Sequence, residues 1–129
     1  MPKYIAPSYL KLKRGLSGLG VFAEKNISKG RFIIEYTGEK ISESVERNNK
    51  YLFRINNKYY IDGSTRKNLA RYINHSCKPN CEVIIKNQKI LIYAVKNIPA
   101  ATELTYDYGK EYFNDFIKPH GCRCAKCKR

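Results

Sequence analysis

The eleven-residue stretch RYINHSCKPNC, residues 71–81, restricts the fold and the chemistry of this chain more than any other feature. It places amide, imidazole, hydroxyl and thiol groups together beside a conformationally rigid proline. Asn and Pro are also ordinary turn residues, so a polar loop without a function is one interpretation. Loops with so many donors, acceptors and ligands are more often binding or catalytic loops. We therefore expect this stretch to form part of a functional site that residues from elsewhere complete.

The remaining sequence predicts many short strands joined by tight turns. Two hairpins are the clearest, because Asn56-Asn57 and Asn87-Gln88 each separate two β-rich runs. A glycine-rich loop that starts at Gly15 leads into an apolar strand that ends at Ala23, and a turn follows at residues 26–30. The other predicted strands cover residues 9–14, 32–38, 51–55, 58–62, 82–86 and 89–95, with a shorter one inside 103–109.

Helix is predicted at two places. Residues 42–50 are typical of a short helix, with Ser42 as the cap and acidic residues in the first turn. Residues 67–73 predict a helical turn that leads into the central stretch. The fold class is therefore mainly β with few short helices.

Length and hydropathy predict one globular domain. A chain of 129 residues can bury a substantial core. No apolar run approaches the roughly 20 residues that a membrane helix needs, and residues 1–4 carry no apolar signal region. We expect an intracellular protein, in the cytoplasm or associated with chromatin or a nucleoid, and no membrane partner.

The net charge has two equally good interpretations, a nucleic-acid partner and a biased composition. The chain has 25 Lys and Arg against 11 Asp and Glu, a net charge of +14. Such an excess favours contact with nucleic acid or with proteins bound to it. A biased composition explains the charge equally well, because Lys, Asn and Ile are all abundant and the lysines are spread along the chain.

The cysteines predict a metal site. Five cysteines cannot all pair in disulfides, and a disulfide framework is unusual in an intracellular protein. Cys122, Cys124 and Cys127 lie within six residues, a spacing that suits one shared metal ion better than mutual disulfides. Zinc is the expected ion.

Several motifs, taken in order, resemble those of SET-domain protein lysine methyltransferases that carry a short post-SET zinc segment. They are Gly18-Leu19-Gly20-Val21-Phe22, Tyr36-Thr37-Gly38, Asn74-His75-Ser76-Cys77, the run from Glu103 to Tyr108, and Cys122-x-Cys124-x-x-Cys127. The resemblance covers roughly residues 9–127. It implies a SET domain at residues 1–120 and a zinc-binding tail at 121–129. Its fold would be a set of small β-sheets around a knot-like crossing, in which the C-terminal segment passes under the Asn-His-Ser loop.

The same resemblance implies S-adenosylmethionine as cofactor and a lysine side chain of a protein as substrate, such as a histone or another chromatin protein. The implied cofactor-binding residues are Gly18, Leu19, Gly20, Arg71, Tyr72, Asn74, His75 and Tyr108. The implied catalytic and channel residues are Tyr108, Tyr106 and Tyr36. The implied ligands of a structural zinc ion are Cys77, Cys122, Cys124 and Cys127, with Cys81 as the alternative fourth ligand.

Three finer expectations follow from individual positions. Tyr106 stands where the family has Phe or Tyr, and Tyr there implies mono-methylation. Ala101 stands where the family often has Gly, so a positive φ would strain it. A basic enzyme acting on a basic peptide needs local acid, for which Glu39, Glu43 and Glu111 are candidates.

Two other functions remain alternatives. A basic, zinc-stapled module could bind nucleic acid or chromatin without catalysing a reaction. Cys77 with His75 could instead act as a nucleophile and base, as in a hydrolase, although the sequence identifies no third orienting group. The tyrosine, asparagine and histidine set favours the methyltransferase, because a binding module needs none of it.

Overall fold

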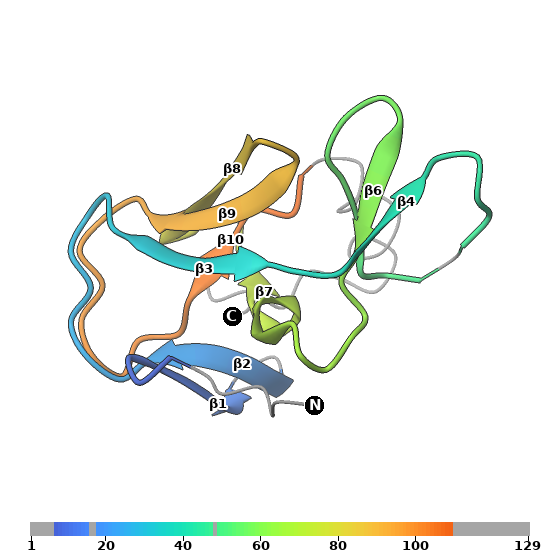
Figure 1. Cartoon of the computed structure of the whole chain (residues 1–129). Helices are drawn as coiled ribbons and strands as arrows, with labels where there is room; N and C mark the ends of the chain where they lie inside the picture. The colour runs from blue at the N-terminus through green and yellow to red at the C-terminus, as the bar shows by residue number, and fades with distance from the viewer. Residues whose placement is uncertain (1–6, 16–17, 48, 110–129) are drawn as a thin grey trace.

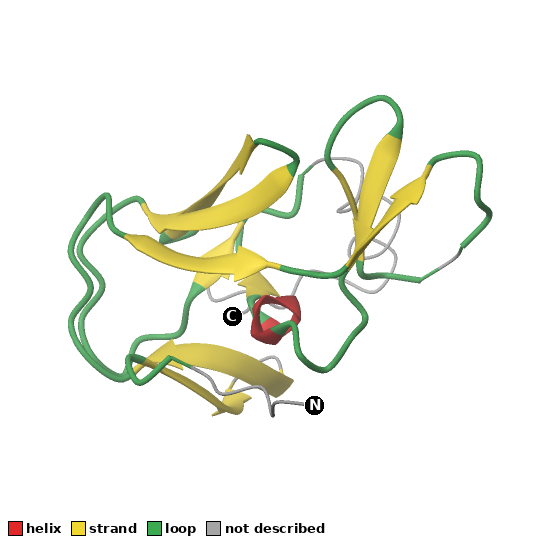
Figure 2. Ribbon diagram, viewed as in Figure 1, coloured by secondary structure: helices red, strands yellow, loops and turns green. Residues whose placement is uncertain are grey.

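The computed structural model describes residues 7–15, 18–47 and 49–109, and it arranges them as short strands in several small sheets (Figures 1 and 2). The strands are β1 Leu10–Gly15, β2 Gly18–Ala23, β3 Phe32–Tyr36, β4 Glu39–Ser42, β5 Leu52–Arg54, β6 Tyr59–Asp62, β7 Asn74–His75, β8 Cys81–Lys86, β9 Lys89–Ala94 and β10 Thr105–Tyr106. One 3-10 turn, η1 Leu69–Tyr72, precedes β7. The predicted class, mainly β with small sheets, is confirmed.

The strands form one two-stranded antiparallel sheet, one parallel pair and two three-stranded antiparallel sheets. β1 pairs with β2, and the orders of the two larger sheets are β3-β9-β8 and β4-β6-β5, all antiparallel. β7 and β10 pair in parallel, although they lie far apart in the sequence. In Figure 1 the β1–β2 hairpin and the β3-β9-β8 sheet lie on either side of η1, and β4 and β6 lie to the right.

Both predicted hairpins are present. The Asn87-Gln88 turn joins β8 to β9, and both residues have positive φ, 52° and 62°. Two left-handed residues are what a two-residue turn needs to match the twist of its strands. In the β5–β6 hairpin, the Asn56 side chain accepts the backbone N–H groups of Lys58 and Tyr59, at 2.8 and 2.9 Å.

The predicted helix at residues 42–50 is wrong, whereas the helical turn within 67–73 is confirmed as η1. β4 runs through Ser42, and the Glu43 N–H bonds across to the Lys58 carbonyl at 2.7 Å, so the chain is still extended where a helix would begin. A turn at residues 43–45 follows, in which Ser42 Oγ accepts the Ser44 N–H. Strand pairing therefore overrides the local helix signal.

Isoleucine side chains from several sheets share one core. Its most deeply buried large members are Val21, Ile33, Ile73, Ile90, Ile92, Ile98 and Leu104. A register shift between Phe32 and Ile34 lets the consecutive residues Ile33 and Ile34 both turn inward. Among the described residues, no helix is long and apolar enough to cross a membrane.

Ala101 has a φ of 70°, as expected from its position. Its N–H donates to the Ala23 carbonyl at 2.7 Å, which holds the turn before Glu103 against β2. A left-handed φ costs a residue with a Cβ roughly 1 kcal/mol relative to glycine. The hydrogen bond between this turn and β2 offsets the strain, and it also sets the position of Glu103.

Candidate active site

The Asn74 side chain lies where β2, β7 and β10 meet. Its Nδ2 donates to the Leu19 carbonyl at 2.9 Å and to Glu103 Oε2 at 2.8 Å. These two bonds tie the glycine-rich strand to the central stretch and to the segment before β10. Three predicted cofactor-binding positions, Leu19, Gly20 and Asn74, are therefore neighbours in space.

A side chain at position 20 would clash with its neighbours, which explains the glycine there. A Cβ at this position would lie 2.3 Å from Glu103 Oε2 and 3.2 Å from Asn74 Nδ2. Any larger residue would displace the carboxylate that holds Asn74. Glu103 is thus a site residue that the sequence analysis did not single out, although it begins one of the recognised motifs.

Asn80 holds the segment before β10 against the end of the central stretch. Its Nδ2 donates to the Glu103 carbonyl at 2.9 Å, and its Oδ1 accepts the Thr105 N–H at 2.9 Å. The Asn80 side chain therefore replaces strand pairing at this point and fixes the approach of β10 to β7.

His75 is buried and linked to both ends of the site. Its Nδ1 accepts the Tyr108 N–H at 3.1 Å, and its Nε2 lies 3.5 Å from Cys77 Sγ. Burial lowers the pKa of His75, although the nearby Asp107 carboxylate opposes the shift. The ring is therefore neutral at pH 7, with its proton on Nε2, where it is a donor for the Cys77 sulfur.

The hydrolase alternative does not fit this arrangement. A Cys–His pair needs a third group that accepts the proton on the far ring nitrogen. Here Nδ1 is an acceptor for the Tyr108 amide, and Asp107 Oδ1 is 3.8 Å away, beyond hydrogen-bond range. Asp107 instead accepts the Gly109 N–H at 2.9 Å, as in an ordinary Asx turn.

A row of aromatic rings joins the three predicted channel tyrosines. Tyr106 and Tyr108 have ring centroids 4.9 Å apart, and Phe53 lies 6.4 Å from Tyr106 and 5.2 Å from Tyr36. Tyr36 and Tyr106 are almost fully buried, at 4% and 5% exposed. The sequence analysis did not identify Phe53, because a single Phe in the β5–β6 hairpin belongs to no recognisable motif.

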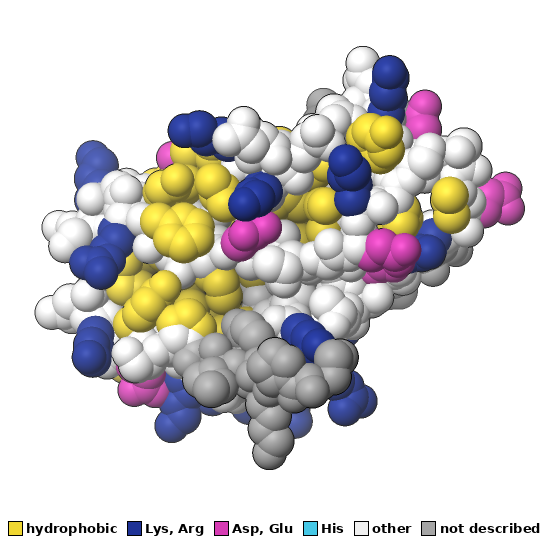
Figure 3. All heavy atoms as spheres, in the orientation of Figure 1, with side chains coloured by type: hydrophobic (Ala, Val, Ile, Leu, Met, Phe, Trp, Pro, Cys, Tyr) yellow, Lys and Arg dark blue, Asp and Glu magenta, His cyan; other side chains and the backbone are white. Residues whose placement is uncertain are grey.

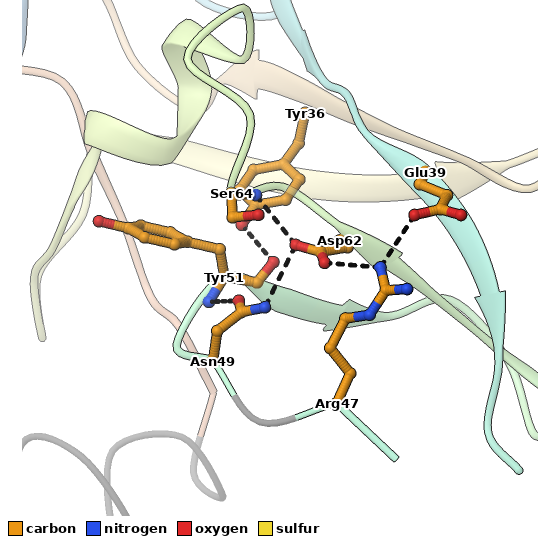
Figure 4. Close-up of polar contacts among 7 residues, drawn as sticks. All are labelled: Tyr36, Glu39, Arg47, Asn49, Tyr51, Asp62 and Ser64. Atoms are coloured by element: carbon orange, nitrogen blue, oxygen red, sulfur yellow. Dashed lines mark hydrogen bonds and ion pairs between the residues drawn. The ribbon is translucent and has the colours of Figure 1, made fainter. Parts of the chain in front are cut away.

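The hydroxyl groups of two of these tyrosines are fixed by backbone carbonyls. Tyr108 donates to the carbonyl of Ile73, and Tyr36 donates to the carbonyl of Tyr51 at 2.8 Å (Figure 4). Each ring is therefore fixed by the hydrogen bond of its hydroxyl as well as by packing.

Arg71 and Tyr72 lie toward the β5–β6 hairpin. The Arg71 guanidinium stacks 4.8 Å from the Tyr51 ring centroid and 4.7 Å from that of Tyr72. It also donates to the Ser64 carbonyl and to the Tyr72 hydroxyl. The contacts of Arg71 connect η1 to the channel side of the site, whereas those of Asn74 connect to Leu19 and Gly20.

The comparison with protein families decides the class of this fold. The SET domain model matches residues 18–109, which includes every described site residue. The chain belongs to the SET-domain family. The match lies inside the predicted SET domain of residues 1–120, and the predicted boundary at 120–121 lies outside the described residues.

Curated relatives of this SET domain carry histone methyltransferase names. A protein of Emericella nidulans named histone-lysine N-methyltransferase, H3 lysine-4 specific, is 44% identical over 126 residues, which is 84% of this chain and 10% of the relative. Human histone-lysine N-methyltransferase 2D is 40% identical over 136 residues, 94% of this chain and 2% of the relative. A Schizosaccharomyces pombe protein named as H3 lysine-4 specific is 44% identical over 105 residues, 70% of this chain and 11% of the relative. This chain thus spans about a tenth or less of the length of these relatives.

The proposed zinc ligands are only partly within the described residues. Cys77 is half-buried near His75, whereas Cys122, Cys124 and Cys127 lie outside the described part of the chain. Within that part there is no group of three or more His, Cys, Asp or Glu residues that could hold a metal ion. Burial raises the pKa of the Cys81 thiol to about 12.

Two of the three candidate acids for substrate binding are paired with arginines. Glu39 binds Arg47 at 2.9 Å, and Glu43 lies 3.5 Å from Arg54. Glu43 also lines an open groove of about 570 Å³ on the β4-β6-β5 sheet, beside Val45 and Glu46. Glu111 lies outside the described residues. Lys and Arg side chains are dispersed over the face shown in Figure 3, without a single basic block.

Proposed function

We propose that this SET domain is an S-adenosylmethionine-dependent protein lysine N-methyltransferase that acts on a histone in chromatin. The observation that carries the proposal is the junction of two sets of residues at Tyr108. One set, Leu19, Gly20, Asn74 and His75, suits a cofactor, and the other, Tyr36, Phe53 and Tyr106, suits a lysine channel. The names of the relatives support a histone as substrate.

The residues around Gly20 fit the cofactor. Gly20 is buried, with Glu103 and Asn74 packed against its Cα, whereas Leu19 beside it is 45% exposed and open to a ligand. The two bonds of Asn74 use its Nδ2, so its amide oxygen remains an acceptor for a bound amine. When bound there, S-adenosylmethionine supplies the methyl group on a positively charged sulfur. Leu19, Gly20, Asn74 and His75 would hold it, and Tyr108 would act where these residues meet the channel tyrosines.

The channel residues would favour the neutral form of the substrate lysine. Removing the proton from a lysine with a pKa of about 10.4 costs on the order of 4 kcal/mol near neutral pH. Buried rings such as Tyr36 and Tyr106 disfavour the ammonium by excluding water, which lowers this cost. The proton then leaves to water, and the tyrosines align the neutral amine opposite the methyl group.

Calorimetric titration of the zinc-loaded protein with S-adenosylmethionine tests the proposal without knowledge of the substrate. We expect saturable one-to-one binding that Asn74→Ala weakens at least about tenfold, because the variant loses two hydrogen bonds at the site. Asn97→Ala is the matched control, since the Asn97 side chain accepts the Lys29 N–H in a loop apart from Asn74. No binding by a folded, metal-loaded protein would favour the non-catalytic module that binds nucleic acid or chromatin.

Tyr106→Phe is expected to change the product from mostly mono-methyl to mostly dimethyl lysine. The Tyr106 ring packs within the aromatic row, and in this proposal its hydroxyl takes the space that a second methyl group would need, so its removal would free that space. Mass spectrometry of a methylated histone gives the product ratio. Tyr93→Phe, on the outer face of β9, is the control. Equal product ratios for wild type and Tyr106→Phe would refute the assignment.

A further inference from the structure

Asp62 is the one buried carboxylate among the described residues, and the mechanism above does not use it. It lies at the end of β6, in the segment that connects the β5–β6 hairpin to η1. An ionised carboxylate is rarely buried unless several donors compensate for the lost water. Its partners therefore indicate what the burial achieves.

Three donors converge on the Asp62 carboxylate (Figure 4). Arg47 Nη1 donates to Oδ2 at 2.9 Å, and Oδ1 accepts from Asn49 Nδ2 at 3.3 Å and from the Ser64 N–H at 3.1 Å. Burial by itself would raise the pKa of Asp62, but these hydrogen bonds outweigh it, so the pKa is lowered. The group is charged at neutral pH, and it holds Arg47 and Asn49 against β6.

A chain of hydrogen bonds continues from Asp62 to the channel wall. Asn49 Oδ1 accepts the Tyr51 N–H at 2.8 Å, which fixes the peptide plane next to the Tyr51 carbonyl. That carbonyl accepts the Tyr36 hydroxyl at 2.8 Å and the Gly63 N–H at 3.0 Å. Figure 4 shows the chain running from Glu39 and Arg47 through Asp62 and Asn49 to Tyr51 and Tyr36.

Close packing makes the Tyr36 ring sensitive to small shifts here. A Cβ on Gly63 would lie 2.3 to 2.5 Å from atoms of the Tyr36 ring, so this ring rests directly on the backbone after Asp62. A Cβ on Gly38 would lie 2.0 Å from the Asp62 carbonyl oxygen. The Tyr36 ring is therefore held in place by the backbone after Asp62, and the hydrogen bonds from Asp62 through Asn49 and Tyr51 set the position of its hydroxyl.

We propose that Asp62 is a positioning residue for the substrate-lysine channel, acting through Asn49 and Tyr51 on the hydroxyl of Tyr36. The inference rests on the proposed function, because it assigns Tyr36 to the lysine channel. Asp62 itself touches neither substrate nor cofactor. Its carboxylate holds Arg47 and Asn49, and the position of Asn49 defines where the Tyr51 carbonyl receives the Tyr36 hydroxyl.

The test is a double-mutant cycle between Asp62→Asn and Tyr36→Phe. Each single variant is expected to lower kcat/KM for core histones on the order of tenfold, because the lysine is less well aligned. The double variant is expected to be no worse than Tyr36→Phe, since Asp62 acts through the hydroxyl that this variant lacks. The Kd for S-adenosylmethionine should stay within about twofold of wild type. Glu24→Gln is the matched control, because it removes a carboxylate from the exposed pair with Lys11.

Two further measurements keep the test decisive. Asn49→Ala interrupts the same series of hydrogen bonds but keeps the ion pair between Arg47 and Asp62. It should lower kcat/KM to the same extent as Asp62→Asn, so it can replace Asp62→Asn if the latter folds poorly. Amide hydrogen exchange should quicken at Tyr51 and Gly63 in both variants, while Ile92 in the β3-β9-β8 sheet is unchanged. This readout does not depend on activity. Multiplicative losses in the double variant, or unchanged exchange at Tyr51 and Gly63, would overturn the inference. A wild-type protein that methylates no histone would instead refute the proposed function.

Discussion

Tyr108→Phe is expected to slow methyl transfer about 100-fold or more while cofactor binding is retained. Tyr108 joins the two halves of the site, with its ring 5.3 Å from that of His75 and 4.9 Å from that of Tyr106. Its hydroxyl donates to the Ile73 carbonyl, which fixes the position of the oxygen, and in the proposed function this oxygen would accept from the substrate amine and the transferring methyl group. Phenylalanine keeps the packing and loses that acceptor. Single-turnover rates with core histones, together with calorimetry of S-adenosylmethionine binding, measure the two effects separately.

Tyr9→Phe is the matched control for this experiment. The Tyr9 hydroxyl also donates to a buried carbonyl, that of Ile33, but it lies away from the site. Both variants leave one buried carbonyl without its donor and should lose about 1 to 2 kcal/mol of folding stability. If Tyr108→Phe and Tyr9→Phe retain the same activity, Tyr108 has only a structural role.

Cys77→Ser is expected to abolish zinc binding and, with it, high-affinity binding of S-adenosylmethionine. A tetrahedral site of four thiolates that loses one ligand binds zinc much more weakly. His75 Nε2 lies 3.5 Å from Cys77 Sγ and orients it, and a serine hydroxyl cannot replace a thiolate ligand of zinc. We expect metal analysis to give one zinc per chain in the wild type and less than about 0.2 in the variant.

Cys81→Ala is the control for the zinc experiment. Cys81 is buried, its pKa is raised to about 12, and its sulfur donates to Asn80 Oδ1 at 3.3 Å. Its removal should leave the zinc content unchanged. Full zinc content in Cys77→Ser, or loss of zinc in Cys81→Ala, would exchange the assigned roles of these two cysteines.

Local patterns in the sequence predicted most strands and turns. They did not predict where pairing with a distant strand overrides a local preference. The Asn56-Asn57 and Asn87-Gln88 hairpins were predictable because two-residue turns have a strong local preference. The helix predicted at residues 42–50 failed because β4 continues to pair with β6 through Ser42. That competition involves residues far along the chain, which a local signal at Ser42 cannot show.

Motifs in the sequence predicted which residues form the site, but not how these residues contact one another. Asn74, His75 and Tyr108 were named from the resemblance, and the structure brings them together with Leu19 and Gly20. Glu103 and Phe53 were missed because their roles exist only in the folded chain, where one fills the space above Gly20 and the other bridges two tyrosines. The role of Asp62 was equally hidden, since a single Asp after a strand has an ordinary turn function.

The parallel pairing of β7 with β10 determines when the site can exist during folding. Each strand has two residues, so the pair contributes too little to offset the entropy of closing the long intervening loop. β8 and β9 lie within that loop and form a local hairpin, which shortens the effective distance once it is in place. The two halves of the site therefore meet late, after the local hairpins have formed. A chain arrested before that step would retain much of its strand content and none of its binding geometry.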